Sequence, residues 1–426
     1  MDIHVVRPGE SLYGIALQYG VSMSQLINDN QLPDPSRLVP GQTLVIQYPA
    51  ALHAVQSGES LSSISAMHDI TVRELLRNNP VLRGESTLYP GQTLVLSYQQ
   101  EKLGTLSVNG YAYPNVDRGL LQRTLPYLTE LTPFTYGFTP EGQLVDLNDQ
   151  PLIDAALQLD VRPLLHLSTL TEEGGFSNEL AHILLNDEAL QETLITQLLD
   201  TISRKGYRGL DVDFEYVYGS DADAYARFIS RLHEALSPLG LPLIVALAPK
   251  VFADQPGRLY EGHNYAMLAQ AADFVLLMTY EWGYTYGPPM AVAPVRNVRQ
   301  VLDYAMTEMP PEKVYLGIPN YGYDWLLPYR PGSRATSISN QYAVELAARN
   351  NVSIRYDTSA QSPWFRYTAP NGREHEVWFE DARSIRAKLE LAREYGLHGV
   401  GYWNLMRPFP QNWLVLNALY DIRDGL

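Results

Sequence analysis

From about residue 104 to the C-terminus, apolar runs of strand length alternate with longer amphipathic stretches. Stretches such as Ala222–Leu236 and Val298–Met306 have the spacing of helices that bury one face. Strands and helices in this order predict parallel pairing, and eight units predict a closed (β/α)8 TIM barrel of the α/β class. The predicted strands are Leu106–Tyr113, Pro133–Phe138, Arg162–Leu167, Gly209–Phe214, Pro242–Leu247, Phe274–Tyr280, Val314–Tyr321 and Gly399–Trp403.

The segment between the seventh and eighth predicted strands is too long for a single helix. It contains three further strand-like runs and an Asn371-Gly372 pair that is typical of a hairpin turn. These runs are Ser353–Tyr356, Trp364–Tyr367 and Glu376–Phe379. We therefore expect a small α+β insertion, at about residues 323–380, within a barrel domain that spans residues 104–426.

The first hundred residues contain one pattern twice. Val6–Leu12 matches Val55–Leu61, and Pro40–Val45 matches Pro90–Val95. Each unit has the pattern strand, helix, helix, strand, so we expect two small βααβ modules at residues 2–48 and 52–98. We expect a serine to cap the first helix of each unit and apolar residues to line the helices of the first, which gives Ser11, Ser60, Ile15, Leu17 and Leu26.

Both modules resemble LysM modules in their Gly-Glu-Ser-Leu opening and their Pro-Gly-Gln-Thr-Leu close. The resemblance implies that they bind glycans containing N-acetylglucosamine, chiefly peptidoglycan or chitin. A small fold that serves only as a spacer is the alternative.

Composition narrows the classes of function. The chain has 31 Lys and Arg against 47 Asp and Glu, a formal charge of −16, which argues against a nucleic-acid partner. It has no cysteine, so disulfides, thiolate metal sites and thiol nucleophiles are excluded. The histidines are scattered, and we expect neither a metal nor another cofactor. Tyrosine is abundant, with 29 residues against 10 phenylalanines. Its apolar ring and polar hydroxyl suit surfaces that bind polar ligands.

The N-terminus has neither the basic nor the apolar region of a secretory signal, and no apolar run reaches the roughly 18 residues of a membrane span. We therefore expect a soluble protein without a signal peptide or a membrane partner. The oligomeric state is not predicted.

The fourth predicted strand carries alternating carboxylates. Side chains alternate along a strand, so Asp211, Asp213 and Glu215 share one face. In a barrel this face is the interior, where burial and mutual repulsion raise the pKa of at least one carboxyl group. A carboxyl group that stays protonated near neutral pH can act as a general acid. A solvated acidic face is the alternative.

This strand resembles the motif D-x-x-D-x-D-x-E of the family-18 glycoside hydrolases. The resemblance implies that Glu215 is the general acid and base, that Asp213 orients the acetamido group of the substrate, and that Asp211 supports Asp213. Arg208 stands at the first Asp of the motif. An arginine beside three carboxylates would lower their pKa values and oppose the acid role unless it points away.

Residues at the ends of the sixth and eighth predicted strands also match motifs of this family. Met278 and Tyr280 match its Met-x-Tyr-Asp, with Glu281 in place of the Asp, and the resemblance implies that Tyr280 donates to the acetamido oxygen. Trp403 matches the family's tryptophan, which lies beneath the sugar ring at the bottom of the site. An ordinary core position remains open for both aromatic residues. The predicted substrate contacts are Met278, Glu281, Trp403, Asn320, Tyr321 and Tyr111.

A narrower resemblance covers essentially the whole chain. Phe214-Glu215, Met278–Gly283, Ile318–Trp325 and the paired modules resemble the cortex-lytic N-acetylglucosaminidases (cortical fragment-lytic enzymes) of spore-forming bacteria. The resemblance implies hydrolysis of spore-cortex peptidoglycan during germination, in the coat or cortex region, by a retaining mechanism in which the substrate's acetamido group takes part. A chitin-oligosaccharide hydrolase is one alternative. A non-catalytic glycan-binding barrel is another, which Arg208 favours and Glu215 opposes.

Overall fold

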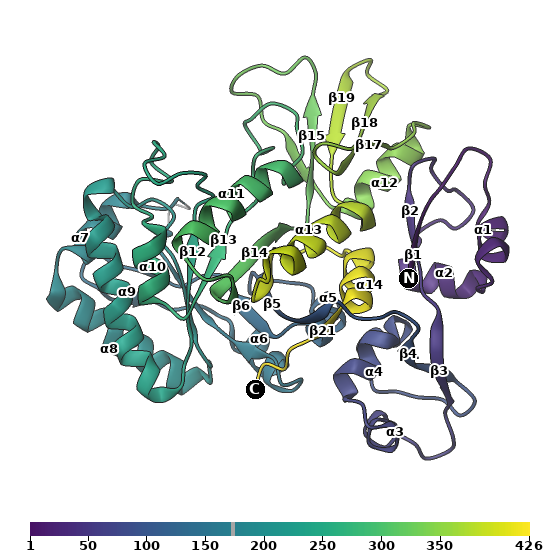
Figure 1. The fold of residues 1–426 in the computed structure, drawn as a ribbon, viewed down its shortest axis with the longest axis horizontal. Coiled ribbons are helices and arrows are strands. Elements are labelled where there is room, and N and C mark those ends of the chain that lie inside the picture. Colours follow the sequence, from purple (N-terminus) through teal and green to yellow (C-terminus); the bar gives the residue numbers. More distant parts are fainter. Residues whose placement is uncertain (172–174) are drawn as a thin grey trace.

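After residue 103, one set of strands pairs in parallel and forms a closed barrel (Figure 1). The computed structural model describes residues 1–171 and 175–426. In order around the barrel, the strands are β5 (Gly104–Ala112), β6 (Glu130–Pro133), β9 (Arg162–Pro163), β10 (Leu165–Ser168), β11 (Leu210–Asp213), β12 (Leu243–Leu247), β13 (Phe274–Leu277), β14 (Val314–Pro319) and β20 (Gly399–Trp403). β9 and β10 flank Leu164 and together fill the third of eight positions, because β6 pairs with β9 and β10 pairs with β11. The predicted TIM barrel is confirmed.

Helices surround the barrel and bury its outer face. The apolar residues of the strands that point outward form one core with these helices, while a smaller apolar cluster fills the barrel interior. The helices are α5 (Arg118–Thr124), α6 (Gln150–Leu157), α7 (Asn178–Leu185), α8 (Glu188–Lys205), α9 (Ala222–Leu236), α10 (Tyr265–Ala271), α11 (Val295–Glu308), α13 (Ala382–Tyr395) and α14 (Pro410–Leu419). A short strand, β21 (Tyr420–Ile422), returns the chain to β5.

The second barrel strand differs from its prediction. β6 ends at Pro133, where the predicted strand begins, and Gly137–Phe138 forms β7, which pairs with β8 (Leu144–Val145). The pattern missed β6 because Glu130 and Thr132 point away from the outer core and are buried despite their polarity. A prediction that looks for continuous apolar runs does not detect a strand whose inward side chains are polar.

The insertion between β14 and β20 is a five-stranded antiparallel sheet with one helix on it. We call it the insertion lobe; it projects above the barrel in Figure 1. Its elements are β15 (Gly322–Leu326), β16 (Thr336–Ile338), α12 (Asn340–Arg349), β17 (Arg355–Asp357), β18 (Ser362–Thr368) and β19 (Glu374–Trp378).

The two N-terminal modules each have the predicted order of elements. The first consists of β1 (Asp2–Val5), α1 (Leu12–Tyr19), α2 (Met23–Asn30) and β2 (Thr43–Ile46), and the second of β3 (Pro49–Ala54), α3 (Leu61–His68), α4 (Val72–Asn78) and β4 (Thr93–Tyr98). The hydroxyls of Ser11 and Ser60 accept from the backbone N–H groups of Gly14 and Ser63, so both predicted caps are confirmed.

The predicted apolar positions of the first module lie in its helices, but they are not all buried. Ile15 and Leu26 are buried, whereas the side chain of Leu17 is 71% exposed. The helix α1 spans only two turns, and its inner face already contains Leu12, Ile15 and Ala16. Leu17 follows Ala16 directly and therefore points away from that face.

Candidate active site

The carboxylates of β11 point into the barrel, as alternation predicts. Leu210, Val212 and Phe214 are fully buried in the core between the strands and the helices. Asp211 and Asp213 lie on the opposite face and are also buried. Glu215 follows the carboxyl end of the strand, the end at which barrel enzymes build their active sites.

The buried carboxylates have few partners. The hydroxyl of Tyr111, on β5, donates to Asp211 Oδ2 at 2.6 Å. Nε2 of the buried His166, on β10, lies 3.8 Å from Asp213 Oδ2. Among the described residues, neither Asp211 Oδ1 nor Asp213 Oδ1 has a hydrogen-bond partner. No arginine or lysine pairs with either carboxylate in that part of the chain.

This environment favours the protonated forms of the carboxyl groups. Burial raises the pKa of Asp211 to about 8, and burial also raises the pKa of Asp213. The pKa of Glu215 is raised by burial first, and then by the negative charges of Asp213 and Glu281. A carboxyl group at the mouth of the barrel can therefore keep its proton near neutral pH and donate it to a bound substrate.

Arg208 does not oppose this effect. Its side chain is exposed before the start of β11, and Nη1 donates to the carbonyl oxygens of Gly206 and Tyr207 at 3.3 and 3.2 Å. Asp211 and Glu215 lie farther along the strand, and their pKa values are set by burial and by neighbouring groups other than Arg208.

Two predicted site residues, Met278 and Tyr280, follow the end of β13, the sixth barrel strand. Met278 packs against the interior cluster of the barrel with Tyr111 and Leu276. Tyr280, two residues later, has a pKa well above its usual value because of burial and then because of the charges of Asp213 and Glu215. Tyr280 therefore lies in the same electrostatic environment as the carboxylates.

Glu281 is held by two tyrosines that precede and begin the insertion lobe. The hydroxyl of Tyr321 donates to Glu281 Oε1, and that of Tyr323 donates to the same oxygen at 3.0 Å. Glu281 is exposed overall, but partial desolvation of its carboxylate raises its pKa, and the two hydroxyl donors oppose that rise. The predicted contacts Glu281 and Tyr321 thus contact each other in the structure.

Trp403 ends β20 within a group of aromatic rings. Its centroid lies 4.8 Å from that of Phe134, 5.7 Å from Tyr111 and 6.1 Å from Tyr113. Trp403 and Tyr113 are only partly buried, so part of this aromatic surface is accessible. Such a surface can stack on the apolar face of a sugar ring.

Asn320 has a different environment from the other predicted contacts. Its Nδ2 donates to the carbonyl oxygens of Asn404 and Arg407, both at 2.8 Å. The side chain is buried and fixes the backbone that follows Trp403. In this structure Asn320 therefore anchors a loop of the site.

The prediction from sequence missed three residues of this site, His166, Phe134 and Tyr113. His166 is fully buried, and its Nδ1 lies 2.6 Å from Thr135 Oγ1, so the ring is held in place beside Asp213. Phe134 and Tyr113 join the aromatic group around Trp403. Alternation along Leu165–Ser168 offered one signal, because a histidine amid leucines of a central strand has to face the barrel interior.

The described residues contain neither a cluster of metal ligands nor a membrane-spanning helix. Within residues 1–171 and 175–426, no group of three or more His, Cys, Asp and Glu side chains is arranged to hold a metal ion. In the same residues, no helix is both long enough and apolar enough to cross a bilayer.

Comparison with known proteins identifies the relatives of this chain. Residues 132–407 match glycosyl hydrolases family 18, and residues 4–47 and 53–97 match the LysM domain. The cortical fragment-lytic enzyme of Bacillus subtilis (strain 168) is 40% identical over 431 residues, which cover 99% of both chains.

Solved structures give the same result. The spore cortex-lytic enzyme SleL of Bacillus cereus superposes with a TM-score of 0.85 at 37% identity, covering 100% of this chain and 99% of that one. A chitinase of Chromobacterium violaceum has a TM-score of 0.69 at 28% identity, covering 74% of this chain and 98% of that one. The chain therefore belongs to the glycosyl hydrolases of family 18 and carries two N-terminal LysM domains.

Proposed function

We propose that this enzyme hydrolyses N-acetylglucosaminyl bonds in peptidoglycan, with the cortex of the bacterial spore as its substrate. The full-length similarity to cortical fragment-lytic and spore cortex-lytic enzymes supports this substrate. The LysM modules, taken as residues 2–48 and 52–98, bind the glycan, and the barrel domain at residues 104–426 cleaves it. The site of action is the coat and cortex region of the spore.

The reaction proceeds with help from the substrate's own acetamido group. Glu215 donates its proton to the glycosidic oxygen while the acetamido oxygen attacks the anomeric carbon. The bond to the leaving sugar breaks, and an oxazolinium intermediate forms. Water then gives a proton to Glu215 and attacks the anomeric carbon, which restores the acetamido group and retains the configuration.

Neighbouring residues orient the acetamido group during these steps. Asp213 accepts its N–H, and Asp211 supports Asp213 while Tyr111 fixes Asp211 through the 2.6 Å hydrogen bond. The Tyr280 hydroxyl donates to the acetamido oxygen. The observation that carries the proposal is the raised pKa of Glu215, at the carboxyl end of a strand whose inward residues are carboxylates.

The remaining contacts line the sugar site. Trp403 stacks beneath the sugar ring, Met278 packs beside it, and Glu281 accepts from a sugar hydroxyl. Tyr321 acts by holding Glu281, and Asn320 acts by holding the loop after Trp403.

Substitution of Glu215 tests the acid role. Glu215→Gln removes the transferable proton but keeps the shape of the side chain, so cleavage of cortex fragments should fall by at least about 100-fold. The products of both forms are measured by mass spectrometry, and circular dichroism and cortex binding show that the variant is folded. Activity within a few-fold of the parent would rule out Glu215 as the acid.

A chitin-oligosaccharide hydrolase is the second candidate. The 28% identity and TM-score of 0.69 with a bacterial chitinase favour it. A side-by-side assay on chitin oligomers and on cortex peptidoglycan that contains muramic lactam decides between the two substrates. A higher kcat/KM on chitin oligomers would reverse our assignment.

A further inference from the structure

The two LysM modules are equivalent in sequence but not in their surroundings. In the first module, Glu10 accepts from the backbone N–H of Arg7, and in the second Glu59 accepts from that of Gln56, both at 2.7 Å. The loop before the last strand differs, however. Val39 in the first module is 3% exposed, whereas Tyr89 at the equivalent position of the second is 68% exposed.

The loop of the first module is part of the insertion lobe's core. Val39 belongs to the same apolar cluster as Ile354 and Phe365 of the lobe. The backbone N–H of Ile354 donates to the carbonyl oxygen of Pro40 at 2.9 Å. Arg37 Nη2 donates to the carbonyl oxygen of Ala348 at 2.7 Å.

The glycine of the Pro-Gly loop is packed differently in the two modules. Gly41 and Gly91 both have a positive φ, at 89° and 85°. A Cβ added at Gly41 would overlap the carbonyl oxygen of Ile354, whereas a Cβ at Gly91 would find no atom of the described residues within 4 Å. The same turn is therefore packed against the lobe in one module and open in the other.

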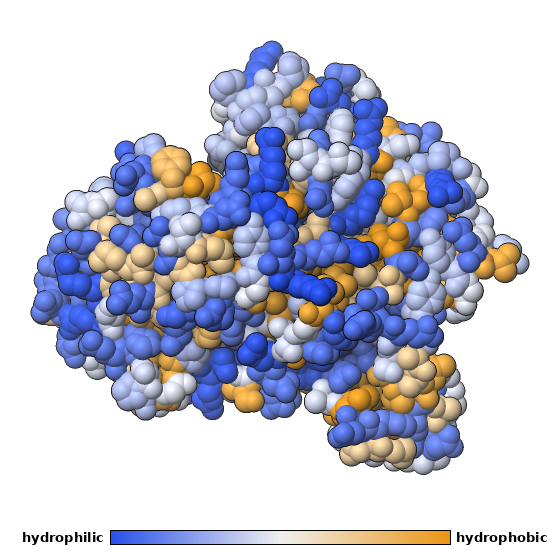
Figure 2. All heavy atoms as spheres, in the orientation of Figure 1, coloured by the Kyte–Doolittle hydropathy of each residue, from blue (hydrophilic) through white to orange (hydrophobic). Residues whose placement is uncertain are grey.

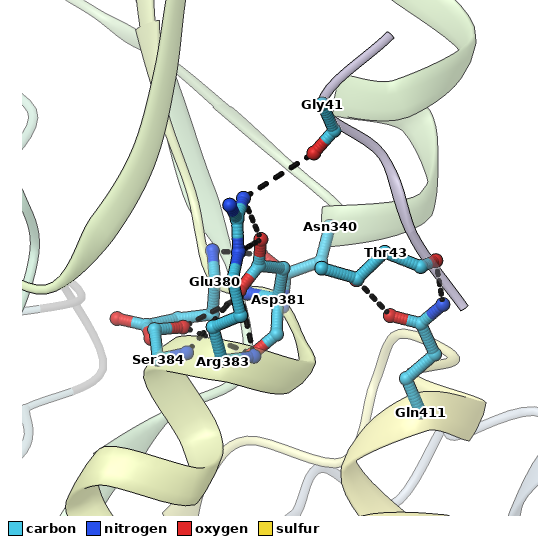
Figure 3. Close-up of polar contacts among 8 residues, drawn as sticks. All are labelled: Gly41, Thr43, Asn340, Glu380, Asp381, Arg383, Ser384 and Gln411. Carbon is cyan, nitrogen blue, oxygen red and sulfur yellow. Dashed lines mark hydrogen bonds and ion pairs between the residues drawn. The ribbon is translucent and has the colours of Figure 1, made fainter. Parts of the chain in front are cut away.

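Polar contacts also join the first module to α13 and α14 of the barrel domain (Figure 3). Arg383 Nη2 donates to Gly41 O at 3.3 Å and to Asp381 Oδ2 at 2.6 Å. Gln411 of α14 accepts from the hydroxyl of Thr43 at 2.8 Å and donates to its carbonyl oxygen at 2.6 Å.

The lobe in turn reaches the active site. On β19, Val377 lies in the cluster that contains Val39, while its neighbour Trp378 lies in a second cluster on the opposite face. Tyr280 and Trp403 of the active site pack against this second cluster. Tyr323, from the same cluster, also holds Glu281. A continuous packing path therefore joins the first module to the sugar site.

We propose that the first LysM module braces the insertion lobe over the substrate cleft, and that the second module alone keeps its Pro-Gly loop free for the glycan polymer. Figure 2 shows apolar side chains on the surface of this second module. The part that concerns the polymer rests on the proposed function, in which the modules bind glycan. The brace itself rests on the contacts of Val39, Gly41 and Ile354.

The matched glycine variants Gly41→Ala and Gly91→Ala test the brace. Both impose the same strain at a positive φ, but only Gly41→Ala collides with the lobe. With a soluble cortex tetrasaccharide, Gly41→Ala should raise KM about fivefold or more with a smaller change in kcat. Gly91→Ala should stay within about twofold of the parent. Equal KM values for the two variants would overturn the brace.

The pair Val39→Ala and Tyr89→Ala tests the division of roles and does not depend on the glycine variants folding. Tyr89→Ala should weaken sedimentation with insoluble cortex about fivefold, and this loss should exceed any change in its tetrasaccharide kinetics. Val39→Ala should raise KM for the tetrasaccharide and leave sedimentation nearly unchanged. Equal loss of sedimentation in both variants would overturn the assignment of the polymer to the second module.

Hydrogen exchange separates failure of the brace from failure of the proposed function. If the parent enzyme does not cleave the tetrasaccharide, the proposed substrate is wrong, but the brace still predicts faster exchange in β17 and β18 for Gly41→Ala than for Gly91→Ala. Identical exchange in the two variants would overturn the brace by itself.

Discussion

At the scale of single residues, the site depends on charge and burial acting on a few carboxyl groups. Glu215 combines both effects, since burial and the charges of Asp213 and Glu281 all raise its pKa. The spacing of Asp211, Asp213 and Glu215 predicted which residues share a face. It did not predict His166 or the tyrosine pair on Glu281, because these contacts join residues that are distant in sequence.

The dependence of kcat/KM on pH should be sensitive to the charge of Glu281. Glu215 must be protonated to act as an acid, so kcat/KM falls as pH rises through its raised pKa. Glu281→Gln removes a negative charge that raises this pKa, and the alkaline limb should therefore move to lower pH by about half a unit or more.

Glu281→Asp is the matched control, because it keeps the charge. Its alkaline limb should stay near that of the parent enzyme, even if shortening the side chain lowers kcat. An alkaline limb of Glu281→Gln that stays in place or moves to higher pH would contradict the proposed electrostatic role.

At the scale of elements, a strand is defined by which side chains it buries and not by apolarity alone. β11 places aliphatic and aromatic residues outward and carboxylates inward, and period-two alternation predicted both sets. β6 follows the same rule with Glu130 and Thr132 buried, but its sequence is too short and too polar to mark it as a strand. In the insertion lobe, strand-like runs and a turn predicted β17, β18 and β19, whereas β15 and β16 were not predicted.

The inward carboxylates of β11 should make the protein less stable as pH rises. Burial raises the pKa of Asp211 from its ordinary value to about 8, so the folded state binds more protons than the unfolded state between these pH values. The free energy of unfolding therefore falls as pH rises through this window.

Asp211→Asn should remove this contribution. The variant keeps an oxygen for the Tyr111 hydroxyl but has no charge to bury, so it should be more stable than the parent at pH 8 and differ little at pH 4. Urea unfolding at both pH values measures the difference. Greater stability of the variant only at pH 4 would contradict the sign.

At the scale of the whole molecule, both modules are docked on the barrel domain. The first contacts the insertion lobe and α14, and the second contacts the short helix Leu125–Tyr127 through α4 (Figure 1). Arg77 of α4 is buried there, and burial lowers the pKa of its guanidinium to about 10. Its Nη1 donates to Pro126 O at 3.1 Å, and its own carbonyl oxygen accepts from Tyr127 at 3.1 Å.

Loss of Arg77 should loosen the second module. Arg77→Ala leaves the carbonyl oxygen of Pro126 without this donor and opens a cavity, at a cost of about 2 kcal/mol in the free energy of unfolding. Faster proteolysis at residues 99–103 should accompany this loss. Arg204→Ala, at an exposed arginine of α8, is the control and should change neither quantity measurably.

The sequence by itself determined the architecture and the acidic strand. Local periodicity specified the barrel, the repeated modules and the shared face of Asp211, Asp213 and Glu215, because side-chain direction follows from backbone geometry. Only the tertiary structure decided that Arg208 points away from the carboxylates, that Asn320 anchors a loop and that Glu281 is held by two tyrosines. It also decided that two modules with the same sequence motifs have unlike surroundings. Burial, pKa and docking depend on neighbours brought from distant parts of the chain, and a local pattern does not contain them.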